Sequence, residues 1–179
     1  MQFPLADRTS LLHLSHVHRG GGKFERPDNT LETFRWCWEN GSALECDCRR
    51  TKDGVGIMLH DETLRRTARG IPDALADRPV STELDWAEIK DIDVGSYLSP
   101  DFAHHRIPRI EDVFAAMRAH GLEPKRLRLV QHRAASAPSL ALIEARRGGK
   151  PGLTVCAPLL LTGPDGGDSE EVREIYHVR

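Results

Sequence analysis

The sequence predicts an α/β fold with a partly parallel sheet. Two apolar stretches with strand character, residues 11–17 and 42–51, lie on either side of an amphipathic segment with helical spacing. A second strong helical pattern, residues 107–121, is followed by another apolar stretch, residues 125–132. The chain of 179 residues is 39% hydrophobic, which is enough for one domain with a core. Alternation of strands and helices is typical of this fold class.

The first strand, residues 11–17, ends shortly before the three glycines at 20–22. The helix that follows has Leu31, Phe34 and Trp38 at helical spacing, so we expect one apolar face. Asn29 or Thr30 can cap its start, and Gly41 is a natural terminator.

The second strand, residues 42–51, is followed by a tight turn at Lys52-Asp53-Gly54 and a third strand, residues 55–60. The short turn predicts that these two strands form a hairpin or near-hairpin. A polar loop is expected from residue 61 to about residue 83, and a short helix in "ELDWAEIKDIDVG".

The helix at 107–121 is the clearest element of the second half. Pro108 is near its start, Ile110, Val113 and Met117 share one face, and Gly121 ends it. Beyond about residue 131 the pattern weakens; we expect a short helix in "SLALIEARR" and a strand in "LTVCAPLLL". The predicted organisation is one domain over residues 1–130 and a divergent or irregular segment over residues 131–179.

Charge and composition exclude some classes of function. A formal net charge of −2 gives no electrostatic case for nucleic acid or an anionic membrane as the main partner. No apolar run approaches the roughly 20 residues that span a bilayer, and the first 20 residues lack the pattern of a signal peptide. We therefore expect a cytoplasmic protein without a transmembrane segment. The four cysteines do not form a disulfide or zinc pattern.

Two carboxylates, Glu45 and Asp47, are two residues apart on the second predicted strand and should face the same way. Two carboxylates this close repel each other and resist desolvation. A hard divalent cation such as Mg²⁺ or Ca²⁺ would offset both the repulsion and the cost of desolvation. The alternative is a solvated strand face on which the acids pair with Arg49 or Arg50.

Histidines follow two of the predicted strands. His18 comes after the first strand and precedes Arg19, and His60 ends the third strand. Ligands of α/β sheets collect at the carboxyl ends of strands, so these side chains and the acid pair are candidates for one acid–base and metal site. The Arg19 guanidinium suits phosphate, and the three glycines would let backbone N–H groups approach an anion. In an alternative interpretation, His16 and His18 face one way on a strand and both bind zinc, as in some barrel hydrolases.

Six blocks in order, "HRGGG", "RPDNTLETF", "LECDCRRTKDG", "LHDETLRRT", "DVGSYLSPDF" and "IPRIEDVF", resemble the glycerophosphodiester phosphodiesterase family. The resemblance covers about residues 14–120. It implies a TIM-type (β/α) barrel, a divalent metal such as Mg²⁺ or Ca²⁺, and metal-dependent hydrolysis of glycerophosphodiesters to sn-glycerol 3-phosphate and an alcohol.

The resemblance also implies roles for single residues. His18 and His60 are similar to the family's acid–base histidines, Glu45 and Asp47 to its first two metal ligands, and Arg19 to its phosphate-contacting arginine. The substrate would be a small glycerophosphodiester, and no nucleic acid is expected.

The chain departs from the family pattern at several positions. Asp28 stands where the family usually has Glu, and the strand "LRLVQHRAA" lacks the family's further acidic ligand and lysine. A full barrel takes about 250 residues, so this chain would supply an incomplete one. An incomplete barrel would expose sheet edges, which favours homo-oligomers. A second expectation is therefore a catalytically impaired fragment that serves as an anion-binding or interaction module.

Overall fold

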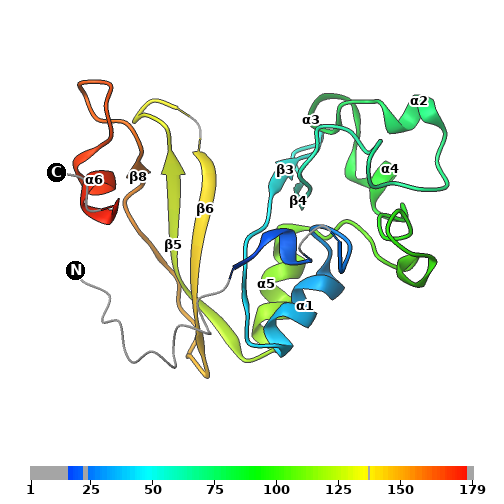
Figure 1. The fold of residues 1–179 in the computed structure, drawn as a ribbon, viewed down its shortest axis with the longest axis horizontal. Helices are drawn as coiled ribbons and strands as arrows, with labels where there is room; N and C mark the ends of the chain where they lie inside the picture. Colours follow the sequence, from blue (N-terminus) through cyan, green and yellow to red (C-terminus); the bar gives the residue numbers. More distant parts are fainter. Residues whose placement is uncertain (1–15, 22–23, 137, 177–179) are drawn as a thin grey trace. The chain divides into compact units, whose positions relative to one another are not determined.

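The computed structural model describes residues 16–21, 24–136 and 138–176 of the chain. The chain forms two compact units, residues 1–116 and residues 117–179, which we call the N-terminal and the C-terminal unit. Figure 1 shows the elements in the order of the chain. None of the helices in the described ranges combines the length and the apolar character needed to cross a membrane.

The described part of the N-terminal unit starts with two parallel strands that are connected by a helix. Its first elements are β1 (His16–Val17), η2 (His18–Gly20), α1 (Leu31–Glu39) and β2 (Ala43–Leu44). β1 and β2 are parallel, with His16 opposite Ala43 and Val17 opposite Leu44. The expected strand–helix–strand unit is confirmed from residue 16 onward, and residues 11–15 of the expected first strand lie outside the described residues.

The helix α1 forms where its apolar spacing predicts. Phe34 and Cys37 are fully buried on its inner face. Thr30 occupies the N-cap position with an extended backbone, and Gly41 follows the helix with φ 72°. Gly41 adopts this left-handed conformation without the steric cost of a Cβ atom, so it ends the helix as expected.

A hairpin follows, made of β3 (Cys48–Arg50) and β4 (Gly56–Met58), which pair antiparallel. The Thr51 N–H donates to the Val55 carbonyl at 2.9 Å, and Gly54 has φ 91°, which closes the turn as predicted. The expected continuous strand over residues 42–51 is wrong, because residues 45–47 separate β2 from β3. Backbone hydrogen bonds still hold this gap on both sides, from Glu45 to Val17 and from Leu59 to Asp47.

Residues 61–107 form an ordered connection, where a polar loop was expected for its first half. It contains three one-turn helices, α2 (Asp73–Ala76), α3 (Val80–Glu83) and α4 (Trp86–Ile89), and η3 (Pro100–Phe102). The reason is an apolar cluster that buries widely spaced side chains, and its members include Ile57, Leu59, Leu64, Val80, Leu84, Ile89, Val94 and Ile107. Burial of each large aliphatic side chain stabilises the fold by about 1.5–3 kcal/mol.

α5 (Ile110–Ala119) begins after this connection and confirms the helix predicted at 107–121. The segment before it pairs with β4, because the Met58 N–H donates to the Pro108 carbonyl at 2.9 Å. The strand β4 therefore has backbone partners on both edges, β3 and the segment that leads into α5.

The C-terminal unit is a small mixed sheet with one helix. Its elements are β5 (Leu122–Gln131), β6 (Pro138–Arg147), β7 (Thr154–Val155), β8 (Leu159–Leu160) and α6 (Glu170–Tyr176). β5 pairs antiparallel with β6 and parallel with β7 and β8 (Figure 1). The expected helix in "SLALIEARR" is wrong: this segment is β6, and its partner β5 supplies the cross-strand contacts that decide the structure of a short apolar run.

Candidate active site

The loop after β1 has an unusual backbone. Arg19 has φ 52° and Asn29 has φ 54°, and these are the two non-glycine residues with positive φ among the described residues. The Asn29 N–H donates to the Arg19 carbonyl at 3.0 Å, so each holds the other in place. Left-handed backbone in residues other than glycine costs of the order of 1–3 kcal/mol and collects at functional sites. The strain therefore marks this loop as a candidate site.

Two of the expected anion-binding glycines serve packing. A Cβ atom on Gly20 would lie 2.8 Å from the Phe34 ring, and one on Gly21 would lie 2.4 Å from the Arg26 carbonyl oxygen. Both distances are too short for a side chain, so Gly20 lets the loop lie directly against α1 and Gly21 lets the loop fold back on its own backbone at Arg26. Gly22 lies outside the described residues.

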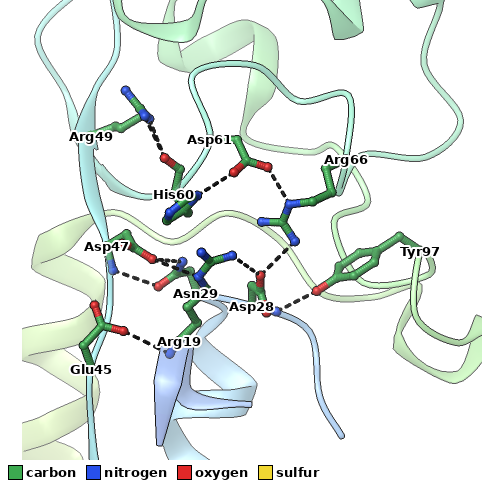
Figure 2. A network of polar contacts seen from close by, with 10 residues as sticks. All are labelled: Arg19, Asp28, Asn29, Glu45, Asp47, Arg49, His60, Asp61, Arg66 and Tyr97. Carbon is green, nitrogen blue, oxygen red and sulfur yellow. Dashed lines mark hydrogen bonds and ion pairs between the residues drawn. The ribbon is translucent and has the colours of Figure 1, made fainter. Parts of the chain in front are cut away.

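Arg19 brings the two acids together. Its backbone N–H donates to Glu45 Oε2 at 3.2 Å, and its Nε atom lies 3.4 Å from Asp47 Oδ2. Figure 2 shows both acids on the same stretch of chain, beside Arg19. The extended backbone of residues 45–47 thus places these side chains as a strand would, although the segment is not assigned as one.

Asn29 fixes the orientation of Asp47. Its side-chain amide donates to Asp47 Oδ2 at 3.0 Å, and its amide oxygen accepts the Asp47 N–H at 3.0 Å. This reciprocal pair needs an amide, because one side chain must donate and accept at the same time. Asn29 is 3% exposed, so its half of the pair is shielded from water, whereas Asp47 stays partly exposed.

A second branch of the network begins at His60. Its Nδ1 atom lies 2.5 Å from Asp61 Oδ1, and Arg66 donates through Nε to Asp61 Oδ2 at 2.5 Å. Arg66 also donates through Nη1 to Asp28 Oδ2 at 2.8 Å, and the same oxygen accepts from Arg19 Nη1 at 3.0 Å. An unbroken series of polar contacts therefore links His60 to Arg19 (Figure 2).

Further contacts hold the ends of this series. Arg49 donates to the His60 carbonyl through Nε at 3.0 Å and Nη2 at 2.7 Å, and it also pairs with Glu62. The Asp28 N–H donates to the Tyr97 hydroxyl at 2.9 Å. The site is thus supported by β3 and by the connection that follows β4.

Electrostatics follow from these contacts. Burial opposes ionisation of Asp61, but the hydrogen bonds from His60 and Arg66 outweigh it and lower the pKa of this carboxyl. Burial likewise disfavours the charged Arg66, but its bonds to Asp61 and Asp28 prevail and raise its pKa. Burial raises the pKa of the Tyr97 hydroxyl.

A cavity of about 10 Å³ lies beside the network, with Asp28, Asn29, His60 and Arg66 among its lining residues. This is about the space that one water needs. The remaining wall includes apolar side chains, of which Leu59 and Ile107 are buried. A polar group held here is thus partly shielded from bulk water, which strengthens electrostatic interactions.

The acid pair suits a cation by its charge. Asp28 and Asp61 are neutralised by guanidinium groups at hydrogen-bonding distance, whereas Glu45 accepts only a neutral backbone N–H in the described contacts and Asp47 faces Arg19 at 3.4 Å. Within the described part of the chain, no group of three or more His, Cys, Asp or Glu side chains is placed to hold a metal ion. Glu45 and Asp47 have the oxygen donors that a hard cation prefers, but two carboxylates are fewer ligands than such a cation takes.

The remaining predicted residues have less support. His18 is the first residue of η2, directly before Arg19, and its side chain is exposed. The side chain of His16 lies outside the described residues, so the zinc alternative stays untested. Four further residues belong to the network although no site role was expected for them: Asn29, Asp61, Arg66 and Tyr97. Of these four residues, Asp61 could have been found from the sequence, because it directly follows the candidate histidine His60.

Comparison with known proteins gives a consistent picture. The model of the glycerophosphoryl diester phosphodiesterase family matches residues 18–141. The glycerophosphodiester phosphodiesterase of Caldanaerobacter subterraneus subsp. tengcongensis is 36% identical over 99 residues, which are 55% of this chain and 37% of that protein. Glycerophosphodiester phosphodiesterase 1 of Bos taurus is 32% identical over 119 residues, 65% of this chain and 32% of that protein.

Solved structures of such enzymes are also similar. A glycerophosphodiester phosphodiesterase from Agrobacterium tumefaciens is 28% identical with a TM-score of 0.51, over 65% of this chain and 46% of that one. A phosphodiesterase from Oleispira antarctica, in complex with the product sn-glycerol-3-phosphate, is 25% identical with a TM-score of 0.52, over 64% of this chain and 44% of that one. The chain thus spans about a third of the length of the curated relatives and less than half of these structures.

Proposed function

Because the chain belongs to the glycerophosphoryl diester phosphodiesterase family, we propose that it carries the phosphate- and metal-binding part of a metal-dependent site. The reaction is hydrolysis of a glycerophosphodiester to sn-glycerol 3-phosphate and an alcohol. The observation that carries this proposal is the connected network in which Glu45, Asp47, Arg19 and His60 take part. The product in the Oleispira antarctica structure supports a small glycerophosphate ligand.

In this proposal, Arg19 binds the phosphate. Its guanidinium is a planar donor fork that can pair with two phosphate oxygens. Its Nη1 atom donates to Asp28 and its Nε atom lies buried beside Asp47, so the guanidinium is held in place by two acids before any ligand binds. Glu45 and Asp47 would hold a divalent cation such as Mg²⁺ or Ca²⁺. When bound, such a cation neutralises charge on the phosphodiester oxygens.

The histidines move the protons. One of His18 and His60 takes the proton of the attacking hydroxyl as its oxygen bonds to phosphorus, and the other protonates the alkoxide as the second P–O bond breaks. The attacking hydroxyl belongs to water or to the glycerol part of the substrate; in the second case a cyclic phosphate forms as the alcohol leaves, and water then opens the ring to give sn-glycerol 3-phosphate. Asp61 accepts from His60 Nδ1, which leaves His60 Nε2 for the reacting groups.

The fold proposal follows from the same likeness. We infer that residues 1–130 correspond to the first part of a TIM-type (β/α) barrel and that residues 131–179 diverge from it. The parallel pair β1–β2 with α1 between them supports this, since it is the repeating unit of such barrels.

A second candidate function is anion binding without turnover. It is favoured by the partial ligand set in the described residues, because two carboxylates alone hold a divalent cation weakly. On this account the chain binds phosphate compounds through Arg19, and the histidines do no chemistry.

The test measures cation binding and turnover together. Calorimetric titration with Mg²⁺ or Ca²⁺ should give binding that Glu45→Gln with Asp47→Asn abolishes. Zinc in the purified protein and activity insensitive to loss of Glu45 would favour the His16 and His18 alternative instead.

His60→Ala should lower kcat on glycerophosphocholine far more than it raises KM, whereas replacement of the exposed His104 by Ala should leave both unchanged. Equal losses in the two histidine variants would contradict the assignment of His60.

A further inference from the structure

We propose that Arg66 is a positioning residue that holds the acid–base histidine His60 and the phosphate-binding Arg19 in one fixed arrangement. The inference rests on the proposed function and goes beyond it, because Arg66 lies in the connection after β4 and touches neither of those two residues directly in the described contacts. It acts through two carboxylates, Asp61 and Asp28, as Figure 2 shows.

The branch toward His60 fixes a tautomer. Asp61 receives the Arg66 Nε–H on one oxygen at 2.5 Å and faces His60 Nδ1 with the other at 2.5 Å. The pKa of Asp61 is lowered, so this carboxyl is an ionised acceptor at neutral pH and the proton of a neutral His60 belongs on Nδ1. Arg66 prevents rotation of Asp61 away from the ring, and it thereby keeps Nε2 as the nitrogen that exchanges protons.

The contacts from Arg66 toward Arg19 fix the position of the Arg19 guanidinium. The Asp28 side chain is 2% exposed, and its Oδ2 atom accepts from Arg66 at 2.8 Å and from Arg19 at 3.0 Å. Two guanidinium donors hold this one oxygen from different sides, and loss of Arg66 would leave Asp28 with Arg19 as its remaining charged partner and with freedom to turn from its present position. Arg66 thus keeps Asp28 in the position from which it orients Arg19.

Only an arginine can make this bridge. Its Nε and Nη1 atoms donate in fixed directions to two different acids, whereas a lysine presents one ammonium at the end of a flexible chain. The neighbouring Arg65 provides the contrast, because it pairs with Asp73 and Asp77, two acids that are largely exposed. The same substitution at these adjacent positions should therefore have different consequences.

The test reads the His60 tautomer by NMR of protein labelled with ¹⁵N-histidine, with the His60 signal assigned by its loss in His60→Gln. In the unchanged protein, His60 should be protonated on Nδ1 in its neutral form. Arg66→Met should give a mixture of the two tautomers, Arg66→Lys an intermediate ratio, and Arg65→Met no change. An unchanged tautomer in Arg66→Met, with the fold verified by circular dichroism, would overturn the proposal, as would an equal shift in Arg65→Met.

Kinetics then separates this inference from the proposed function. If the chain turns over glycerophosphocholine, Arg66→Met should lower kcat roughly ten- to hundredfold, the usual loss for partners that orient a functional side chain. Asp61→Asn combined with Arg66→Met should lower kcat by less than the product of the two single losses, because Arg66 acts on His60 through Asp61. Additive losses would contradict the proposal. An inactive chain that keeps the Nδ1 tautomer and loses it in Arg66→Met would refute the enzymatic function and support the positioning role.

Discussion

The replacement Asp28→Asn tests how much the buried carboxylate contributes. Asp28 accepts hydrogen bonds from Arg19, which is 13% exposed in its side chain, and from Arg66, which is 35% exposed. Removing one partner of a buried ion pair costs about 3–5 kcal/mol. Because Arg66 remains partly hydrated and is screened by water, we expect the lower end, about 3 kcal/mol of the free energy of unfolding.

The assay is urea unfolding followed by circular dichroism, with Asp73→Asn as the matched control. Asp73 also pairs with an arginine, but its side chain is 87% exposed, so its replacement should leave the free energy of unfolding unchanged within error. Asp28→Glu keeps the charge and adds one methylene, so it tests whether the stability depends on the position of the carboxylate between Arg19 and Arg66. Equal small losses in Asp28→Asn and Asp73→Asn would refute the reasoning, because burial would then have no effect on the value of the pair.

Three further predictions concern the N-terminal unit. Leu64→Ala removes a fully buried side chain from the apolar cluster and should lower the free energy of unfolding by about 2–5 kcal/mol, measured by urea titration; a loss below 1 kcal/mol would contradict this packing. The pKa of Asp61 is lowered on folding, so its contribution to stability is complete above its ordinary pKa of about 4 and is lost as pH falls through its folded value. Asp61→Asn should therefore flatten the acid side of the stability profile, and an unchanged profile would count against the contact. Burial raises the pKa of Cys46 to about 12, so iodoacetamide at pH 8 should label it more slowly than a free thiol peptide; equal rates would contradict the burial.

Several elements could be predicted from the sequence because their signals are local. α1 and α5 follow from apolar spacing and from the glycines that end them, and the β3–β4 hairpin follows from its tight turn. The short helices α2 and α3 were missed, since four-residue helices have no periodicity and depend on burial of side chains such as Leu64 and Val80. β6 was mistaken for a helix because its structure depends on pairing with β5.

The candidate site divides in the same way. The residue types of Glu45, Asp47 and Arg19 are enough to suggest metal and phosphate binding. Their proximity could also be expected, because the strands that precede them, β1 and β2, are neighbours. The role of Arg66 could not be predicted, because its two acids are 5 and 38 residues away in the chain and only the tertiary fold brings them together. The left-handed backbone of Arg19 and Asn29 was equally hidden, since neither residue requires it.

The most direct test of the account follows glycerophosphocholine by ³¹P NMR in the presence of this chain with Mg²⁺ or Ca²⁺. We expect conversion of the phosphodiester signal to that of sn-glycerol 3-phosphate, stopped by EDTA and absent in Glu45→Gln with Asp47→Asn. A phosphodiester signal that persists with either cation, for a folded chain that still binds it, would contradict hydrolysis at this site.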